Sequence, residues 1–312
     1  MKARNMMWRP VAVVCSGLTG MLIAACSSEQ PTKPQPVPTP VAHSMTGLSL
    51  PISKYIFDPA QEAKVERASD YLTQQCMRRF GFDYPVTPPS KASLATRVFT
   101  EFNSRRYGVT NRESVLLYGY GLPPWVQGAE PRPMEKMSDA EFIVLDGTAD
   151  DSKRSVAGHQ VPPGGCSGEA ERKLSSVGLS TKKGTAGPAA LPAQILQRSF
   201  VRTQSDPRVL KVFQSWSTCM KERGYSYENP FKALGDKRWT REGNRPGKAH
   251  VETALADIDC KKKTNLIGVE YAIESEYQNT EIDRHAEELA SIRKTLMQQL
   301  KAIEKLMGTN GS

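Results

Sequence analysis

A nine-residue stretch that occurs twice constrains the fold of this chain more than any other feature. Both copies have the pattern Cys-Met-basic-x-x-Gly-aromatic-x-Tyr, and they run from Cys76 to Tyr84 and from Cys219 to Tyr227. The glycine of each copy follows a helical pattern, where it readily adopts the left-handed conformation that ends a helix. Each copy is followed, much later, by one further cysteine, Cys166 or Cys260. The repeat therefore predicts two related halves, each with a cysteine near a helix end.

The two halves also open in the same way. Asp58-Pro59 and Asp206-Pro207 place an aspartate at the N-cap and a proline at the first helical position, which are preferred residues there. Few runs in the chain alternate apolar and polar residues as a strand would. These patterns predict a mainly α fold, made of two related helical halves with irregular loops and a long C-terminal helix.

The N-terminus has the pattern of a bacterial lipoprotein signal. Lys2, Arg4 and Arg9 precede an apolar stretch, Val11 to Ala25, that is short for a membrane span. The stretch ends in Leu22-Ile23-Ala24-Ala25-Cys26, which resembles a lipobox, with an aliphatic residue and small residues before the cysteine. The resemblance implies that residues 1–25 are a signal peptide and that Cys26 carries lipid. An ordinary cleaved signal with an incidental cysteine is the alternative.

Residues 26–49 are expected to be a tether. Five prolines fall between Pro31 and Pro40, and such a tract cannot pack a core and favours an extended polyproline II conformation. The predicted organisation is therefore a signal peptide, this tether, a first helical half over residues 50–185 and a second over residues 186–312.

Four cysteines remain once residues 1–25 are removed and Cys26 is lipidated, namely Cys76, Cys166, Cys219 and Cys260. An even number in an exported chain predicts disulfides, and four cysteines allow three pairings. The duplication favours Cys76–Cys166 and Cys219–Cys260, because each bridge then lies within one half.

One cysteine admits a catalytic interpretation. Gly164-Gly165-Cys166-Ser167-Gly168 can be read as G-x-C-x-G, a cysteine version of the nucleophile elbow, and His159 lies seven residues upstream. A helix N-terminus would lower the pKa of a thiol there. The oxidising compartment and the lack of a preceding strand favour a structural disulfide instead.

The C-terminal region predicts a long helix. From Lys248 the chain reads helical almost to its end, and residues 264–307 would span roughly 65 Å at about 1.5 Å per residue. Apolar residues recur every seven positions at Ile282, Leu289, Leu296 and Ile303. Such a stripe either covers the protein's own core or binds a protein partner or a second copy.

Charge and composition narrow the class of protein. The chain has a net charge of +9, of which residues 1–25 contribute three positives and no acid, leaving 9 − 3 = +6. This excess favours anionic surfaces such as phospholipid or wall polymers over nucleic acid, although scattered, solvated Lys and Arg explain most of it. No metal or cofactor site is predicted.

Several stretches together resemble an uncharacterised family of secreted and lipid-anchored actinomycete proteins. They are Cys76-Met77 with Gly81, Arg105 to Gly108, Gly119 to Pro123, Val161 to Ala170, Cys219-Met220 with Gly224, and Cys260 with Asn265 to Val269, Glu274 and Gln278. The resemblance covers most of residues 55–300. It implies an envelope lipoprotein and no particular activity.

These observations predict a non-enzymatic binding or interaction module, anchored by lipid on the outer face of the cytoplasmic membrane. One alternative is an extracytoplasmic hydrolase or thiol enzyme that uses His159 and Cys166 or scattered carboxylates. Another is a solute-binding lipoprotein of a transporter, which would require strands alternating with helices in two α/β lobes.

Overall fold

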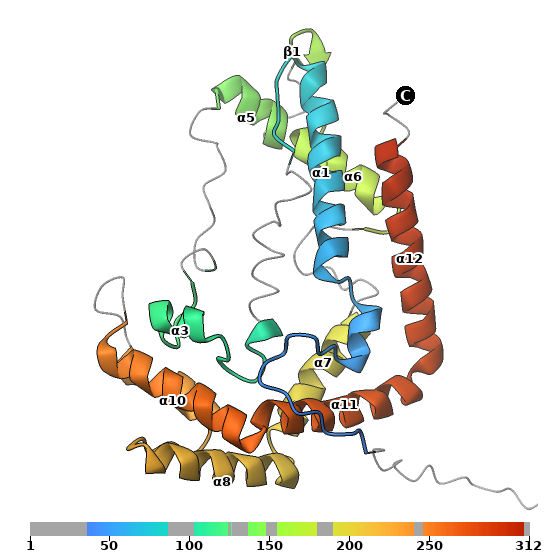
Figure 1. Ribbon diagram of the computed structural model, residues 1–312. Helices are drawn as coiled ribbons and strands as arrows, with labels where there is room; N and C mark the ends of the chain where they lie inside the picture. The colour runs from blue at the N-terminus through green and yellow to red at the C-terminus, as the bar shows by residue number, and fades with distance from the viewer. Residues whose placement is uncertain are drawn as a thin grey trace, which may run out of the picture. The chain divides into compact units, whose positions relative to one another are not determined.

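Helices dominate the part of the chain that the computed structural model describes, which comprises residues 36–86, 103–123, 126, 137–147, 155–179, 190–239 and 246–308 (Figure 1). Residues 34–312 form one compact unit. The elements are η1 (Pro51–Tyr55), α1 (Pro59–Arg79), α3 (Arg112–Tyr118), α5 (Asp139–Asp146), β1 (Ser155–Val156), β2 (His159–Gln160), α6 (Gly165–Ser175), α7 (Ala190–Thr203), α8 (Pro207–Glu222), α9 (Pro230–Leu234), η4 (Lys237–Trp239), α10 (Lys248–Thr264), α11 (Leu266–Arg284) and α12 (Ala286–Gly308). β1 and β2 form one antiparallel hairpin. The prediction of a mainly α fold is confirmed.

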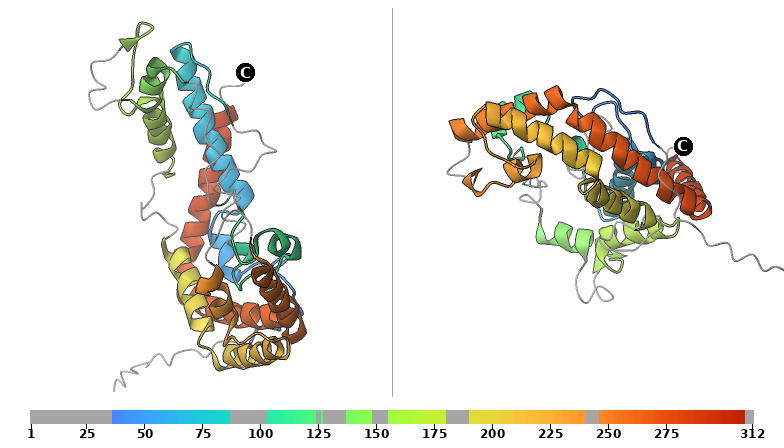
Figure 2. Two further views of the ribbon diagram at one scale, coloured as in Figure 1. Left: turned by 90° about the vertical axis from the view of Figure 1, so that its left-hand side faces the viewer. Right: turned by 90° about the horizontal axis from the view of Figure 1, so that it is seen from below.

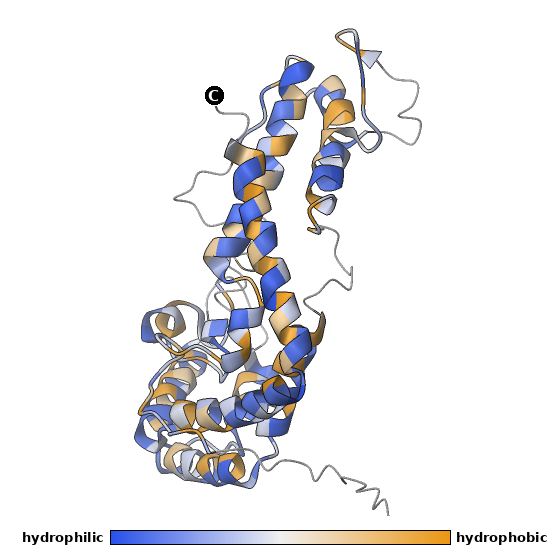
Figure 3. Cartoon of the chain, turned by 90° about the vertical axis from the view of Figure 1, so that its right-hand side faces the viewer, coloured by the Kyte–Doolittle hydropathy of each residue, from blue (hydrophilic) through white to orange (hydrophobic). Residues whose placement is uncertain are grey.

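The duplicated helices begin and end as their sequences predict. Asp58 accepts hydrogen bonds from the backbone of Ala60 and Gln61 at the start of α1, and Asp206 accepts one from Arg208 at the start of α8. Gly81 and Gly224 follow the two helices with φ of 81° and 88°. Blue and orange residues alternate along the helices in Figure 3, as amphipathic helices require.

Two disulfides connect the helices in the pairing that the duplication favours. Cys76 of α1 is bonded to Cys166 of α6, and Cys219 of α8 is bonded to Cys260 of α10. All four cysteines are buried, the first pair beside Phe80 and Val144 and the second pair in the largest apolar cluster of the protein. Each half therefore has its own covalent link.

The apolar cores do not follow the sequence halves, because each half contributes segments to the other. Tyr107, Val115 and Tyr120 from the first half are buried together with Trp216 of α8. Conversely, Ile303 of α12 is buried among residues of α1 and α6. α8 lies beside α10 and α11, which Figure 2 shows from below. The two halves are thus interleaved in three dimensions.

The predicted long C-terminal helix is wrong as one continuous element. Asn265 takes a left-handed conformation, with φ of 51°, and separates α10 from α11. His285 leaves the helical conformation and separates α11 from α12, and the chain changes direction there (Figure 1). A bend at each point lets α11 contact α7 and α8 while α12 contacts α1 and η1.

The heptad stripe of the C-terminal region is covered by this chain itself. Its four apolar members are all less than 9% exposed, and they lie in clusters with η1, α1, α6 and α7. At these four positions the C-terminal region therefore covers the core of its own chain.

The described part of the predicted tether lies against α11. The backbone N–H of Val37 donates to Glu276, and Asn265 both donates to Pro40 O and accepts from Ala42 N. A Cβ on Gly268 would lie 2.0 Å from Pro40 O, so glycine allows the segment to cross α11 there. Residues 37–42 of the predicted tether are therefore packed on the body, and residues 26–35 lie outside the described residues.

Candidate functional site

A cleft of about 1170 Å³ lies near the start of α10. Its walls come from the turn after α3, the turn after α8, the η4 segment and the first turn of α10. Aromatic rings and charged side chains both line it. Such a mixture suits a ligand that has both apolar and polar faces.

Three stacked rings form one side of this aromatic cleft. The rings of Trp239 and His250 lie parallel, with centroids 4.7 Å apart and an interplanar angle of 3°. Tyr120 stacks against both, at 5.9 and 5.8 Å. Trp239 also donates through Nε1 to the carbonyl of Ala233, which fixes its ring plane. The rings therefore form a fixed apolar surface.

A close backbone approach positions His250. The N–H of Tyr120 donates to His250 Nε2 at 2.8 Å, so this nitrogen carries no proton and the ring proton lies on Nδ1. Gly119 has φ of 59°, and a Cβ there would lie 2.6 Å from the His250 ring. Only glycine fits, because any side chain would push the imidazole away from the cleft.

A carboxylate orients the cationic side of the cleft. Asp236 accepts bonds from Arg238 Nε, Arg238 Nη2 and Tyr227 OH, at 2.7–2.9 Å. The Arg238 guanidinium lowers the pKa of Asp236 well below its usual range, while burial and then Asp236 raise the pKa of Tyr227 to about 12. Arg238 remains charged and its side chain is 70% exposed. The Nε and Nη2 atoms of Arg238 are bound to Asp236, so the guanidinium offers its Nη1 side to a carboxylate or phosphate group that lies beside the Trp239 ring.

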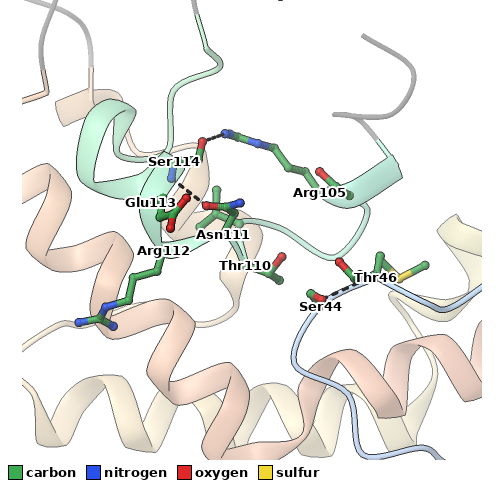
Figure 4. Close-up of a pocket in the computed structure, with 11 residues that line it drawn as sticks. Ser44, Thr46, Arg105, Thr110, Asn111, Arg112, Glu113 and Ser114 are labelled. Atoms are coloured by element: carbon green, nitrogen blue, oxygen red, sulfur yellow. Dashed lines mark hydrogen bonds between the residues drawn. The ribbon is translucent and has the colours of Figure 1, made fainter. Parts of the chain in front are cut away.

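A smaller pocket of about 450 Å³ lies at the start of α3 (Figure 4). Its cations are already bound within the protein: Arg105 donates to the carbonyls of Tyr120 and Gly121 and to Ser114, and Arg112 pairs with Asp259. Arg238 of the cleft is paired as well, so the choice between the two sites rests on the larger volume of the cleft and on its lining rings. We assign the aromatic cleft as the candidate ligand site.

The thiol hypothesis fails on the structure. Cys166 is bonded to Cys76 and fully buried, so it offers no thiolate. The glycines around it have packing roles: a Cβ on Gly165 would lie 2.4 Å from Leu145 O, and one on Gly168 would lie 2.6 Å from Pro163 O. His159 packs its ring edge-on against Phe80. The G-x-C-x-G pattern is thus a close helix contact.

Other residues of the quoted motifs form a buried polar network around Glu274. Glu274 accepts from Arg106 Nε at 2.9 Å, from Tyr107 OH at 2.8 Å and from Ser199 Oγ at 3.1 Å. Gln278 donates to Glu274 and accepts from the backbone of Ile52. Every one of these groups is satisfied by protein, so the network connects η1, α7 and α11 and does not await a ligand.

Two further acids on this side of the protein are buried. Asp257 accepts from Lys261 Nζ and Trp216 Nε1, both at 2.9 Å. Glu270 accepts one bond, from Gln204 at 2.9 Å, and burial raises its pKa to about 8. Neither lines the cleft.

Within the described ranges, no three His, Cys, Asp or Glu side chains are placed to hold a metal ion, and no helix is long and apolar enough to cross a membrane. The predicted lipidation residue, Cys26, lies outside those ranges. The sequence patterns predict no role for the loop around Trp239. A tryptophan among charged residues is the feature of that loop that could have indicated a binding site.

No family model matches the chain, and neither a curated protein nor a solved structure matches it.

Proposed function

We propose that this chain is a lipid-anchored binding module on the outer face of the cytoplasmic membrane, with the aromatic cleft as its ligand site. The lipobox pattern at Cys26 and the resemblance to lipid-anchored envelope proteins support the anchor. The two disulfides support an oxidising compartment, because such bonds persist mainly outside the cytoplasm.

One observation carries the proposed binding site. Arg238 is held by Asp236 at the edge of the stacked rings of Tyr120, His250 and Trp239. An oriented guanidinium beside a flat apolar surface binds ligands that carry an anionic group next to a ring or aliphatic face. Wall fragments that combine sugar rings with carboxylates have this chemistry.

Binding is favoured over catalysis because the candidate nucleophile and the candidate base are both already engaged within the protein. Cys166 is committed to a disulfide, and His250 Nε2 already accepts the Tyr120 amide. A solute-binding protein of two α/β lobes is disfavoured because the described strands amount to one short hairpin.

Calorimetric titration with muramyl dipeptide, which combines a pyranose ring with a carboxylate, tests the site. We expect Arg238→Gln to weaken binding by about tenfold or more, because a hydrogen bond to a charged group contributes about 1.5–3 kcal/mol. Arg223→Gln, which removes an exposed cation paired with Asp259 outside the cleft, is the control. Equal affinities for the parent and Arg238→Gln would exclude the cleft.

The anchor has a separate test. Cys26→Ala should leave an uncleaved precursor or release the protein to the medium. A processed Cys26→Ala protein that stays on the membrane as the parent does would refute lipidation.

A further inference from the structure

The exposed face of α7 and the start of α8 are basic. Between residues 190 and 211 the chain contains four basic residues, Arg198, Arg202, Arg208 and Lys211, and one acid, Asp206. All four basic residues are exposed on the two consecutive helices. We name these four residues the basic stripe.

The single acid of this segment is hidden. Asp206 is 6% exposed, and Arg208 and Tyr277 hydrogen-bond to it. Glu276, which also pairs with Arg208, is 3% exposed. The basic residues of the stripe therefore outnumber the two carboxylates that touch it, and the cations are the groups that face solvent.

Two large apolar side chains stand among these cations. Val201, one residue before Arg202, is 63% exposed, and Leu210, one residue before Lys211, is 45% exposed. Arg202 itself lies 4.1 Å above the ring of Tyr277. Exposed apolar side chains among Arg and Lys are typical of surfaces that contact the headgroup region of a bilayer.

The described body begins beside this stripe. The N–H of Val37 donates to Glu276 Oε1 at 3.0 Å, and Arg208 Nη1 pairs with Glu276 Oε2 at 2.7 Å. One carboxylate thus joins the first described residues to the basic stripe.

The chain between Cys26 and Val37 is short. Eleven residues in polyproline II conformation span about 34 Å at about 3.1 Å per residue. If Cys26 carries lipid, as the proposed function holds, Val37 stays within this distance of the bilayer. A connection of this length raises the local concentration of lipid headgroups around Val37 and the basic stripe beside it.

We infer that the basic stripe, with Val201 and Leu210, is the surface that docks on anionic phospholipid headgroups. The inference rests on the proposed lipid anchor for its placement. It fixes the orientation of the body, because the face that carries α7 and the start of α8 turns toward the membrane.

Vesicle sedimentation of the chain from residue 26 with Cys26→Ser tests the surface without the lipid. Vesicles of phosphatidylcholine with and without phosphatidylglycerol separate charge-dependent binding from general adsorption. Each basic residue near an anionic surface contributes about fivefold in partitioning, so Arg198→Gln, Arg202→Gln and Lys211→Gln together should reduce binding by about 100-fold. The matched control replaces Lys221, Lys262 and Lys263 by glutamine. These lysines are also exposed, and the control removes the same amount of charge as the stripe variant.

Selective loss in the stripe variant, with both proteins giving the parent's circular dichroism spectrum, would support the inference. Equal loss in the two variants would overturn it, since net charge alone would then explain binding. Failure of the parent to bind phosphatidylglycerol vesicles would also overturn it, as would binding to a soluble anionic wall polymer in place of vesicles. Because the assay omits the lipid, a failed anchor and a failed surface give different results.

Discussion

Replacing Glu270 by glutamine should stabilise the protein, and by an amount that grows with pH. Glu270 is fully buried on α11 with one hydrogen bond, from Gln204, and its second oxygen lacks a partner among the described residues. Burial raises its pKa from 4.5 to about 8, Glu274 adds to this, and Lys261 partly offsets it. A group whose pKa is raised by folding contributes full stability below its unfolded pKa and loses it as pH rises toward the folded pKa. The affected window is therefore pH 4.5 to 8.

Each pH unit within this window lowers the free energy of unfolding by about 1.4 kcal/mol, so the cost at pH 7 is about 3 kcal/mol. Glutamine keeps the shape of the side chain and cannot ionise. Urea unfolding at several pH values should show Glu270→Gln gaining about 3 kcal/mol over the parent between pH 5 and 7.5.

Glu252→Gln, on the exposed side of α10, provides the control and should show no such trend. A difference between Glu270→Gln and the parent that stays constant from pH 5 to 7.5 would refute the reasoning. It would mean that Glu270 ionises in the folded protein as it does in the unfolded chain.

Three further predictions concern the frame of the fold. Removing the disulfide Cys76–Cys166, which closes a separation of 90 residues, should lower the free energy of unfolding by about 4–5 kcal/mol. Removing Cys219–Cys260, which closes a separation of 41, should lower it slightly less. A larger loss for the shorter loop would contradict the chain-entropy account. Gly119→Ala should lower the free energy of unfolding by at least about 2 kcal/mol more than Gly224→Ala does, because both glycines have positive φ but only a side chain at position 119 would contact His250. Adding His250→Ala to Gly119→Ala should recover part of the loss. Equal losses for the two glycine variants would remove the steric argument. Ending the chain after His285 should make α1 and α6 sensitive to trypsin, since α12 covers Val65, Ala68 and Leu72, and unchanged protection would show that these helices do not need α12.

Local patterns predicted the local structure well. Asp58-Pro59 and Asp206-Pro207 start helices as N-caps do, and the capping box at Ser138 and Glu141 is present in both directions. The Thr110-x-x-Glu113 spacing is also typical of a capping box, but α3 begins one residue later, because Asn111 is the N-cap and accepts from Ser114 N. The disulfide pairing could also be predicted from the sequence, because the duplication favours one bridge within each half.

Long-range features were beyond such patterns. The bend at Asn265 depends on its bonds to residues 40 and 42, more than 220 positions away. The aromatic cleft depends on His250 meeting Tyr120, which are 130 residues apart. No periodicity in the sequence predicts these long-range contacts. An asparagine within a helical pattern does indicate a site where the left-handed conformation is tolerated.

The contact between α12 and α1 also determines when this protein can finish folding. A chain delivered from its N-terminus releases α1 first and α12 last, so the first helix waits more than 200 residues for the partner that covers Val65 and Leu72. Contacts this distant in sequence slow folding, because a large loop must close before they form. The contacts between α1 and α12 therefore form only after the last helix has been synthesised.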